Sequence, residues 1–304
     1  MQLNSQAGST QVLDGRQLAA EIRAGLTAEV AAMSAAGLLP GLAVVLVGQH
    51  PASVSYVTAK EKACAEVGIR SRTHHLPADA TQEELLQLIG TLNNNSAVHG
   101  ILIQLPLPHG LDESAVLQAV DPAKDVDGFH PVNVGKLVLG EETFLPCTPH
   151  GIMVMLERAG IPTRGRHVVI VGRSNIVGKP LANLLVQKNP QADATVTVCH
   201  TGTRDLATYT RQADILIVAA GRPDTVTAEM VREGAAVIDV GVNRVPDETR
   251  KSGYRLVGDV DYNALLPRVS HITPVPGGVG PMTIAMLLKN TVLAAKRLSG
   301  GGLS

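Results

Sequence analysis

The sequence predicts an α/β protein with two domains, and this prediction rests on three observations. A chain of 304 residues is long for one hydrophobic core and suits two domains of ordinary size. Short apolar runs alternate with amphipathic segments, as in parallel strands covered by helices on both faces. This alternation starts again near residue 150. The second half is spaced like a doubly wound parallel sheet, and the first half like a smaller α/β domain.

In the first half, the apolar runs are short enough for strands and the segments between them have helical periodicity. We expect strands at 42–48, 70–76 and 99–108, and helices at about 14–36, 53–67 and 81–95.

In the second half, a helix is predicted at 148–160, followed by four strands that succeed one another at the spacing of a parallel sheet. These strands are expected at 167–172, 194–200, 213–221 and 235–241. A last strand, "HITPVP", leads into a helix at 280–298, with Pro281 in its first turn, where proline is tolerated. We expect this helix to pack on the first domain. The predicted domains are therefore 1–150 plus 276–304, and 151–275.

Composition excludes several classes of partner. Lys and Arg total 26 against 27 for Asp and Glu, so no overall charge attracts nucleic acid or an anionic membrane. No apolar run approaches the roughly 20 residues that span a bilayer, and "MQLNSQAGSTQ" lacks the regions of a signal peptide. We expect a soluble, cytoplasmic protein. The three cysteines form no C-x-x-C pair, so we expect buried thiols and no metal site.

A phosphate-binding turn is predicted at "HVVIVGRSNIVGKPLANLL", which reads as a strand, a glycine-containing turn and a helix. The usual dinucleotide fingerprint is G-x-G-x-x-G, and here Gly172 is followed by Ser174 and Val177 at the other two glycine positions. The match is partial. Similar turns occur in α/β proteins that bind nothing there, so this motif alone leaves cofactor binding open.

The residues around this turn favour NADP over NAD. Sites for NAD place a carboxylate at the end of the next strand, to hold the ribose hydroxyls. Here that strand ends in His200, Thr201 and Thr203, and Arg173 lies within the turn. A 2′-phosphate would be bound by an arginine and a hydroxyl and repelled by an aspartate. The alternative for Arg173 is a solvated turn residue.

A candidate reaction site comes from Tyr56 and Lys60, which lie four residues apart on a predicted helix and therefore share one face. Gln104 follows the apolar run 100–103 and could hydrogen-bond a lysine without adding a counter-charge. A lysine acts as a base only when neutral, and an adjacent carboxylate would retain its proton. The alternative is an ordinary lysine on a wet helix face.

Two loops are candidates for substrate contact. Asp125 and Asp127 precede a glycine, and an aspartate can accept two parallel N–H bonds from an amidine-like edge, although these residues by themselves favour a turn-capping role. The glycines of "TPVPGGVGPMT", with Pro276, Gly277 and Gly280, allow backbone to approach a flat ligand, or they form a mere connector.

With these motifs in place, the chain resembles the bifunctional methylenetetrahydrofolate dehydrogenase/cyclohydrolase family over nearly its full length. The matching stretches are "PASVSYVTAKEKACAEVGI", "GILIQLPLP", "DPAKDVDGFHPVNVGKL", "PCTPHGI", "VGRSNIVGKP", "DVGVNR", "GDVD" and "TPVPGGVGPMTIAMLLKNT". The resemblance implies a folate-binding first domain, an NADP-binding Rossmann-like second domain, an active-site cleft between them and a homodimer.

The resemblance also implies roles for individual residues. Tyr56 would stack on the folate, Lys60 would be the catalytic lysine with Gln104 as its partner, and Asp127 would anchor the pterin edge. Pro276, Gly277 and Gly280 would also contact the folate. Residues matching the family's cofactor contacts are Gly172, Arg173, Ser174, Thr201 and Val242. Val242 stands where the family usually has isoleucine, and Thr201 where it commonly has serine.

Two other readings stay open at this point. A shikimate-dehydrogenase-like oxidoreductase also joins a small α/β domain to an NADP domain and uses a lysine, but it would not need the Asp127 loop. A dinucleotide-binding module that senses NADP would leave Tyr56, Lys60, Gln104 and Asp127 unexplained.

Overall fold

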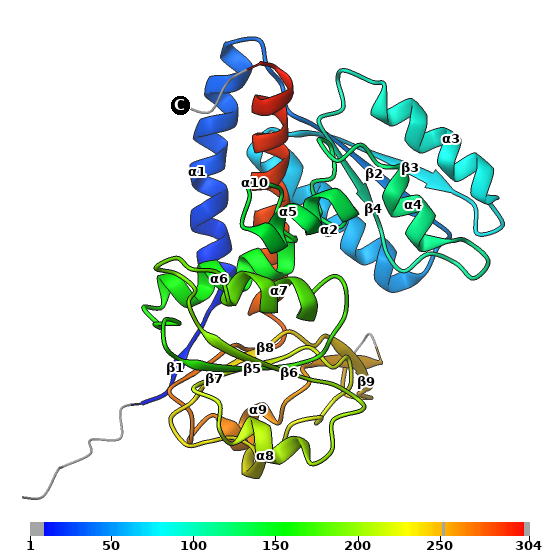
Figure 1. The fold of residues 1–304 in the computed structure, drawn as a ribbon. Helices are drawn as coiled ribbons and strands as arrows, with labels where there is room; N and C mark the ends of the chain where they lie inside the picture. The colour runs from blue at the N-terminus through cyan, green and yellow to red at the C-terminus, as the bar shows by residue number, and fades with distance from the viewer. Residues whose placement is uncertain (1–8, 251–252, 301–304) are drawn as a thin grey trace, which may run out of the picture. The chain divides into compact units, whose positions relative to one another are not determined.

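The protein is described by a computed structural model covering residues 9–250 and 253–300. The chain divides into two compact units (Figure 1). The six-stranded unit comprises Met1–Leu18 and Thr148–Met282, and the three-stranded unit comprises Ala19–Cys147 and Thr283–Ser304. Each is built around a parallel sheet, which confirms the predicted α/β class.

The three-stranded unit has the sheet order β3-β2-β4. The central strand β2 (Gly41–Val47) is buried throughout, whereas β3 (Arg70–Leu76) is an edge strand that pairs with β2 on one side. Its other elements are β4 (Gly100–Ile103), α2 (Pro51–Val67), α3 (Gln82–Asn93), α4 (Glu113–Ala119) and α5 (Pro131–Leu139). Most of α1 (Gly15–Ala35) and α10 (Val279–Leu298) also belong here and lie side by side, joined by an ion pair between Lys296 and Glu29.

The six-stranded unit has the sheet order β1-β11-β8-β7-β5-β6. Its strands are β1 (Gln11–Val12), β5 (His167–Val171), β6 (Thr195–Cys199), β7 (Ile215–Val218), β8 (Ala236–Asp239) and β11 (His271–Ile272). Helices α6 (Cys147–Arg158) and α7 (Gly178–Leu185) lie on one face, and α8 (Leu206–Thr210) and α9 (Tyr262–Leu265) on the other (Figure 1). The short helix η1 (Ala228–Met230) and the hairpin of β9 (Asn243–Pro246) and β10 (Tyr254–Val257) complete the unit.

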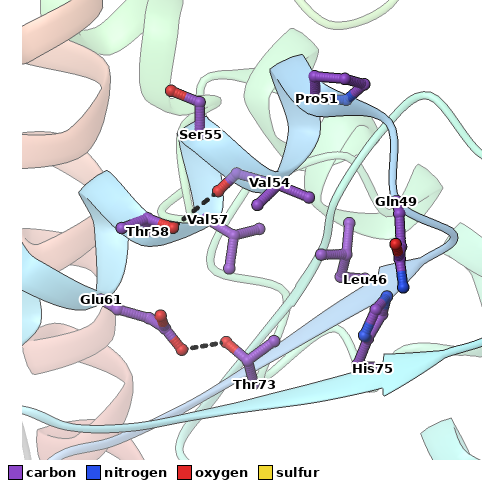
Figure 2. A pocket seen from close by; sticks show the side chains of 10 residues that line it. All are labelled: Leu46, Gln49, Pro51, Val54, Ser55, Val57, Thr58, Glu61, Thr73 and His75. Carbon is purple, nitrogen blue, oxygen red and sulfur yellow. Dashed lines mark hydrogen bonds between the residues drawn. The ribbon is translucent and has the colours of Figure 1, made fainter.

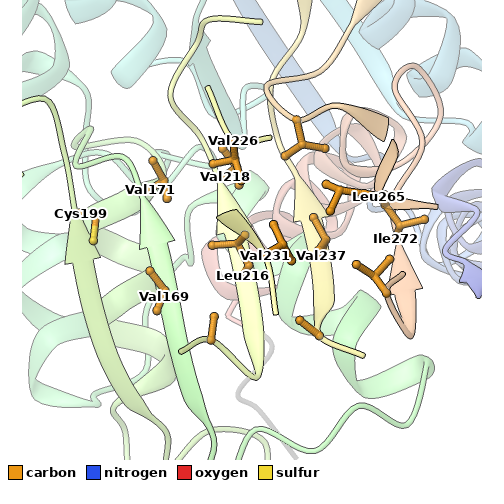
Figure 3. Close-up of a cluster of buried hydrophobic side chains, with 14 residues drawn as sticks. Val169, Val171, Cys199, Leu216, Val218, Val226, Val231, Val237, Leu265 and Ile272 are labelled. Atoms are coloured by element: carbon orange, nitrogen blue, oxygen red, sulfur yellow. The ribbon is translucent and has the colours of Figure 1, made fainter. Parts of the chain in front are cut away.

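The core of the six-stranded unit is built from aliphatic side chains, in agreement with the low aromatic content of the sequence. Aliphatic side chains from neighbouring strands meet side chains of the covering segments, among them Val169, Leu216, Val237, Val231 and Leu265 (Figure 3). Strands that are buried on both faces read as continuous β-branched runs, which is why periodicity located them.

The unit bounds differ from the predicted domain bounds at the N-terminus and near the start of α10, where the six-stranded unit continues to Met282 instead of ending at residue 275. The division assigns the chain up to Leu18 to the six-stranded unit, not to the first domain. β1 pairs in parallel with β11, and the Thr10 hydroxyl donates to the carbonyls of Leu266 and Val269. A strand of two residues leaves no periodic signal in the sequence.

Candidate functional site

The face of α2 that carries Tyr56 and Lys60 is set by the burial of the rest of the helix. Pro51 stands in its first turn, and Gly68 ends it in the left-handed conformation. Val57, Cys64 and Val67 are buried. Tyr56 is 44% exposed, and Lys60, one turn further on, is half-buried. The two predicted residues therefore share a face that is only partly covered.

Gln104 is held so that its amide oxygen meets Lys60. Its backbone N–H donates to the Val45 carbonyl, which extends the β4 side of the sheet by one residue. The side-chain Nε2 donates to the Leu105 carbonyl at 2.7 Å, and Oε1 accepts from Lys60 Nζ at 3.0 Å. Gln104 is buried. The predicted pairing of a lysine with a neutral amide is thus present in the geometry.

Asp127 lies within electrostatic reach of the same lysine. Burial raises the pKa of its carboxyl above the ordinary value, the positive charge of Lys60 opposes this rise, and the charge of Asp125 adds to it. A hydrogen bond with the Cys147 thiol also acts against the rise, but the pKa of Asp127 remains above its ordinary value. The structure therefore brings Lys60, Gln104 and Asp127 together. It also shows that Lys60 has a carboxyl group nearby as well as an amide.

The loop that presents Asp127 is fixed by Asp125. The Asp125 carboxylate accepts from the backbone N–H of Phe129 and His130 and from Asn133 Nδ2, at 3.2, 2.8 and 2.8 Å. Gly128 follows with φ of +72°, and a Cβ there would stand 2.7 Å from the Pro146 nitrogen. Only glycine fits this position. Asp125, weighed as a possible ligand contact, serves here as the brace of the loop.

Two residues of this site escaped the sequence reasoning. Asn290 of α10 is buried and donates from Nδ2 to the carbonyls of Val126 and Leu145, at 2.8 and 3.0 Å. The buried Cys147 thiol donates to the Val126 carbonyl at 3.3 Å. The one available signal was an amide on the apolar face of a predicted helix, which calls for a buried partner.

A pocket of about 630 Å³ lies on another face of α2 (Figure 2). It opens between this helix and strands β2 and β3, and neither Tyr56 nor Lys60 lines it. Within it, the Thr73 hydroxyl donates to Glu61 at 2.5 Å, and the His75 ring contacts the Gly48 carbonyl at 2.8 Å. This hollow contains none of the predicted site residues.

In the six-stranded unit, four strands end at the same level. Val171 of β5 is in register with Cys199 of β6 and Val218 of β7, and Val218 with Asp239 of β8. The loops that follow these strands therefore lie together at the carboxyl ends of the strands. Chain order reverses between β5 and β7, where parallel sheets of this kind bind ligands.

The predicted cofactor residues all lie on these loops. Arg173 and Ser174 follow β5, Thr201 follows β6, and all three are exposed. Ser174 Oγ accepts from the Val177 N–H at 3.1 Å, just before α7. Val242 follows β8 and is 42% exposed.

The turn after β5 has the tight backbone of a dinucleotide cradle. Gly172 has φ of +138°, and a Cβ there would stand 2.3 Å from the Ala219 carbonyl oxygen. A Cβ on Gly178, which opens α7, would stand 2.2 Å from the Gly172 oxygen. Glycine is therefore required twice, although Ser174 and Val177 replace two glycines of the fingerprint. The residues present fit a dinucleotide.

Pro276, Gly277 and Gly280 lie between β11 and the first turn of α10, within the six-stranded unit. The Arg16 N–H donates to the Gly277 carbonyl at 3.1 Å. A Cβ on Gly15 would stand 1.8 Å from the Gly278 oxygen. This segment thus packs directly on the backbone at the start of α1.

Metal and membrane features were searched within residues 9–250 and 253–300. In this part of the chain no cluster of three or more His, Cys, Asp or Glu side chains could hold a metal ion. None of its helices combines the length and apolar character needed to cross a bilayer. The three cysteines, Cys64, Cys147 and Cys199, are buried and free, as predicted.

The fold and these loops define a two-unit enzyme with a dinucleotide-binding sheet and a separate lysine-containing site. Residues 13–127 match the catalytic domain of tetrahydrofolate dehydrogenase/cyclohydrolase, and residues 146–299 match its NAD(P)-binding domain. The chain therefore belongs to the tetrahydrofolate dehydrogenase/cyclohydrolase family. The predicted family and the predicted class, a bifunctional dehydrogenase and cyclohydrolase of folate metabolism, are confirmed.

Individual relatives match along almost the whole chain. The bifunctional protein FolD of Moorella thermoacetica is 57% identical over 287 residues, covering 94% of this chain and 99% of the relative. The crystal structure of FolD from Campylobacter jejuni is 51% identical, with a TM-score of 0.90, and covers 95% of this chain and 99% of that one. FolD from Trypanosoma brucei, complexed with NADP cofactor and inhibitor, is 44% identical, with a TM-score of 0.91, over 95% and 98% of the two chains.

The rival reading as a shikimate-dehydrogenase-like enzyme is not supported. Shikimate 5-dehydrogenase of Thermus thermophilus is 18% identical, with a TM-score of 0.51, over 84% of this chain and 99% of that one. This likeness concerns the fold alone.

Proposed function

We propose that this chain oxidises 5,10-methylenetetrahydrofolate with NADP⁺ and then hydrolyses the 5,10-methenyl product to 10-formyltetrahydrofolate. The observation on which this proposal rests is the hydrogen bond between Lys60 and the neutral amide of Gln104, with Asp127 in electrostatic reach. Tyr56, exposed one turn before Lys60, would supply a flat surface for the folate.

In the hydrolysis, Lys60 acts as the general base. Its neutral Nζ takes one proton from the water whose oxygen bonds to the methenyl carbon, which gives a hydroxyl on that carbon. The bond from the carbon to N5 then breaks as the hydroxyl loses its proton to form the formyl C=O and N5 gains one, so the net reaction releases the single proton taken up by Lys60. Gln104 orients Nζ through Oε1 without adding a negative charge. Asp127 would accept N–H groups of the pterin edge, and these donors would reduce the influence of its charge on Lys60.

The dehydrogenation needs alignment more than acid or base catalysis. Bound NADP⁺ would accept the hydride. Gly172, Arg173, Ser174, Thr201 and Val242 would hold it, because they lie on the loops at the carboxyl ends of the strands. The exposed Arg173 guanidinium and the Thr201 hydroxyl suit a 2′-phosphate. Pro276, Gly277 and Gly280 would contact the folate, as the resemblance implies.

The decisive experiment assays the purified protein with methylenetetrahydrofolate and NADP⁺, following NADPH and the methenyl product by absorbance. The variant Lys60→Met should lower the cyclohydrolase rate by about 10² to 10⁴, the usual contribution of a positioned base, while folate still binds. Lys62→Met is the matched control, since Lys62 is exposed on the same helix. Near-normal hydrolysis by Lys60→Met would reject the role of Lys60.

The same resemblance supports a cytoplasmic homodimer. One chain has a mass of 31.8 kDa, so sedimentation equilibrium should give about twice this value. A single-chain mass at micromolar concentration would contradict the dimer.

A further inference from the structure

Two aspartates of the six-stranded unit are buried in contact with each other and have no place in the reaction described above. Asp239 is the last residue of β8 and is 2% exposed, and Asp259 follows β10 and is 0% exposed. Burying a charge is costly unless hydrogen-bond donors compensate for it. The donors that surround this pair show what it holds in place.

Asp239 holds the segment that contains Asp259. Its Oδ1 accepts from the backbone N–H of Gly241 and Asp259, at 3.0 and 2.9 Å. Its Oδ2 accepts from the Val260 N–H at 3.1 Å. The end of β8 is thereby tied to the chain that follows β10.

Asp259 in turn holds the loop that follows β7 and the first residue of β9, where the loop after β8 ends. Its Oδ2 accepts from the backbone N–H of Ala220 and Gly221, at 2.6 and 2.8 Å. Its Oδ1 accepts from Asn243 Nδ2 at 2.8 Å. Backbone N–H groups in exposed loops can otherwise donate to water. Because one buried carboxylate accepts from two backbone N–H groups and from the Asn243 amide, it restricts both segments that carry these donors.

The surrounding glycines leave space for these two carboxylates. A Cβ on Gly241 would stand 2.1 Å from Asp259 Oδ1, and a Cβ on Gly258 would stand 1.7 Å from Asp239 Oδ2. Any side chain at either position would displace a carboxylate. The local sequence is therefore built around the pair.

The segments held by Asp259 adjoin the proposed cofactor contacts on both sides. Ala220 follows Ala219, whose carbonyl is packed against Gly172 at the start of the phosphate turn. Asn243 follows Val242. A series of contacts therefore links the phosphate turn, through the Asp259 side chain, to the residue next to Val242, at the carboxyl ends of the strands where chain order reverses.

We propose that Asp259, held by Asp239, is a positioning residue for the cofactor half of the reaction. It fixes the loop after β7 and the end of the loop after β8 in the arrangement that receives NADP. This inference rests on the proposed function only in taking NADP to lie at the carboxyl ends of these strands. An asparagine in its place has one acceptor and one donor group, so either the two backbone N–H groups or Asn243 Nδ2 would face a donor.

The test compares Asp259→Asn with Asp214→Asn. Asp214 belongs to the same unit but lies at the amino ends of the strands, just before β7. There it accepts from the backbone N–H of His167 at 2.9 Å and forms an ion pair with Arg232. Three quantities are measured: the Kd for NADP by isothermal titration calorimetry, the KM for NADP, and the cyclohydrolase rate with methenyltetrahydrofolate in the absence of NADP.

For Asp259→Asn we expect Kd and KM for NADP to rise about 10- to 100-fold, the range that corresponds to losing a hydrogen bond to a charged group. The cyclohydrolase rate should stay within about twofold, because Lys60, Gln104 and Asp127, on which the hydrolysis depends, lie in the other unit. Asp214→Asn should leave all three quantities near those of the wild type. If Asp259→Asn does not fold, Asn243→Ser, which removes one donor to Asp259, should show the same pattern more weakly.

Two outcomes would overturn the inference: unchanged NADP binding, or a parallel loss of NADP binding and cyclohydrolase activity, which indicates simple destabilisation. A wild type without either activity would instead refute the proposed function and leave the calorimetric comparison valid.

Discussion

Asp239 shows how strongly a single buried carboxyl couples folding to pH. Burial raises its pKa from the ordinary 3.8 to about 6, against the opposing effect of the three N–H donors, and the charge of Asp259 raises it further. The folded state therefore holds this proton more tightly than the unfolded state does. The contribution of Asp239 to stability is greatest below pH 4, decreases as the pH rises to about 6 and is constant above that value.

The variant Asp239→Asn, which cannot ionise, should lack this dependence. Between pH 4.5 and pH 7 the free energy of unfolding of the wild type should fall relative to that of the variant by about 2 kcal/mol, the larger part of the roughly 3 kcal/mol that the whole pKa shift is worth. Urea unfolding of both proteins at pH 4.5 and pH 7 measures it. A difference between the two proteins that is the same at both pH values would contradict the assignment.

Arg173 is the residue that we expect to discriminate between the two nicotinamide cofactors. Only NADP carries the extra phosphate, so Arg173→Ala should weaken NADP about 10-fold or more and NAD only slightly, in line with the value of a charge-assisted contact. Titration calorimetry with each cofactor measures this, and the exposed Arg158 of α6, changed to Ala, is the control. Equal losses for both cofactors would show that Arg173 is a general turn residue.

At the scale of elements, the sequence pattern located the buried strands, the long helices and the short strand β11, but missed other short elements. β2, β5, β7 and α2 have runs long enough to show a pattern. β1 and α9, with two and four residues, do not, and the β9–β10 hairpin alternates too briefly.

The pairing of Lys60 with Gln104 was predictable because the position of each residue follows from helix and strand geometry. The brace by Asn290 was not, since it joins α10 to a loop more than 140 residues away.

Asn290→Ala tests how far α10 supports the Asp127 loop. The substitution leaves the buried Val126 carbonyl and the partly buried Leu145 carbonyl without this donor, which should lower the free energy of unfolding by about 2 to 4 kcal/mol. Folate binding should weaken as the loop loosens. Lys289→Ala, exposed on the same helix, should change stability by less than about 0.5 kcal/mol. Equal stabilities of the two variants, by chemical denaturation, would argue against this role.

At the scale of the whole molecule, each unit has its own sheet, its own core and its own set of proposed contacts. The sequence indicated two domains through the repeated alternation of strands and helices, but it could not place residues 9–18, whose attachment depends on strand pairing with β11. The family resemblance supplied the roles of Tyr56 and Asp127, which spacing alone left undecided.

Hydrogen exchange of the intact protein should separate the two units. NADP should slow amide exchange in the loops after β5, β6, β7 and β8, because a ligand that binds the folded state suppresses its local opening. Amides of β2 and β4 should respond less to NADP. Mass spectrometry of peptides at saturating NADP gives the measurement. Protection concentrated within Ala19–Cys147 would place the cofactor elsewhere.

The edge strand β3 also bears on the behaviour of the protein at high concentration. An edge of seven residues is long enough to recruit a strand from another molecule and so to begin aggregation. Exposed Arg70 and Arg72 stand along it, and like charges brought together by such pairing repel each other. Replacing both with Thr should therefore increase light scattering on mild heating, although neither residue belongs to the proposed site. The composition of this strand serves colloidal solubility.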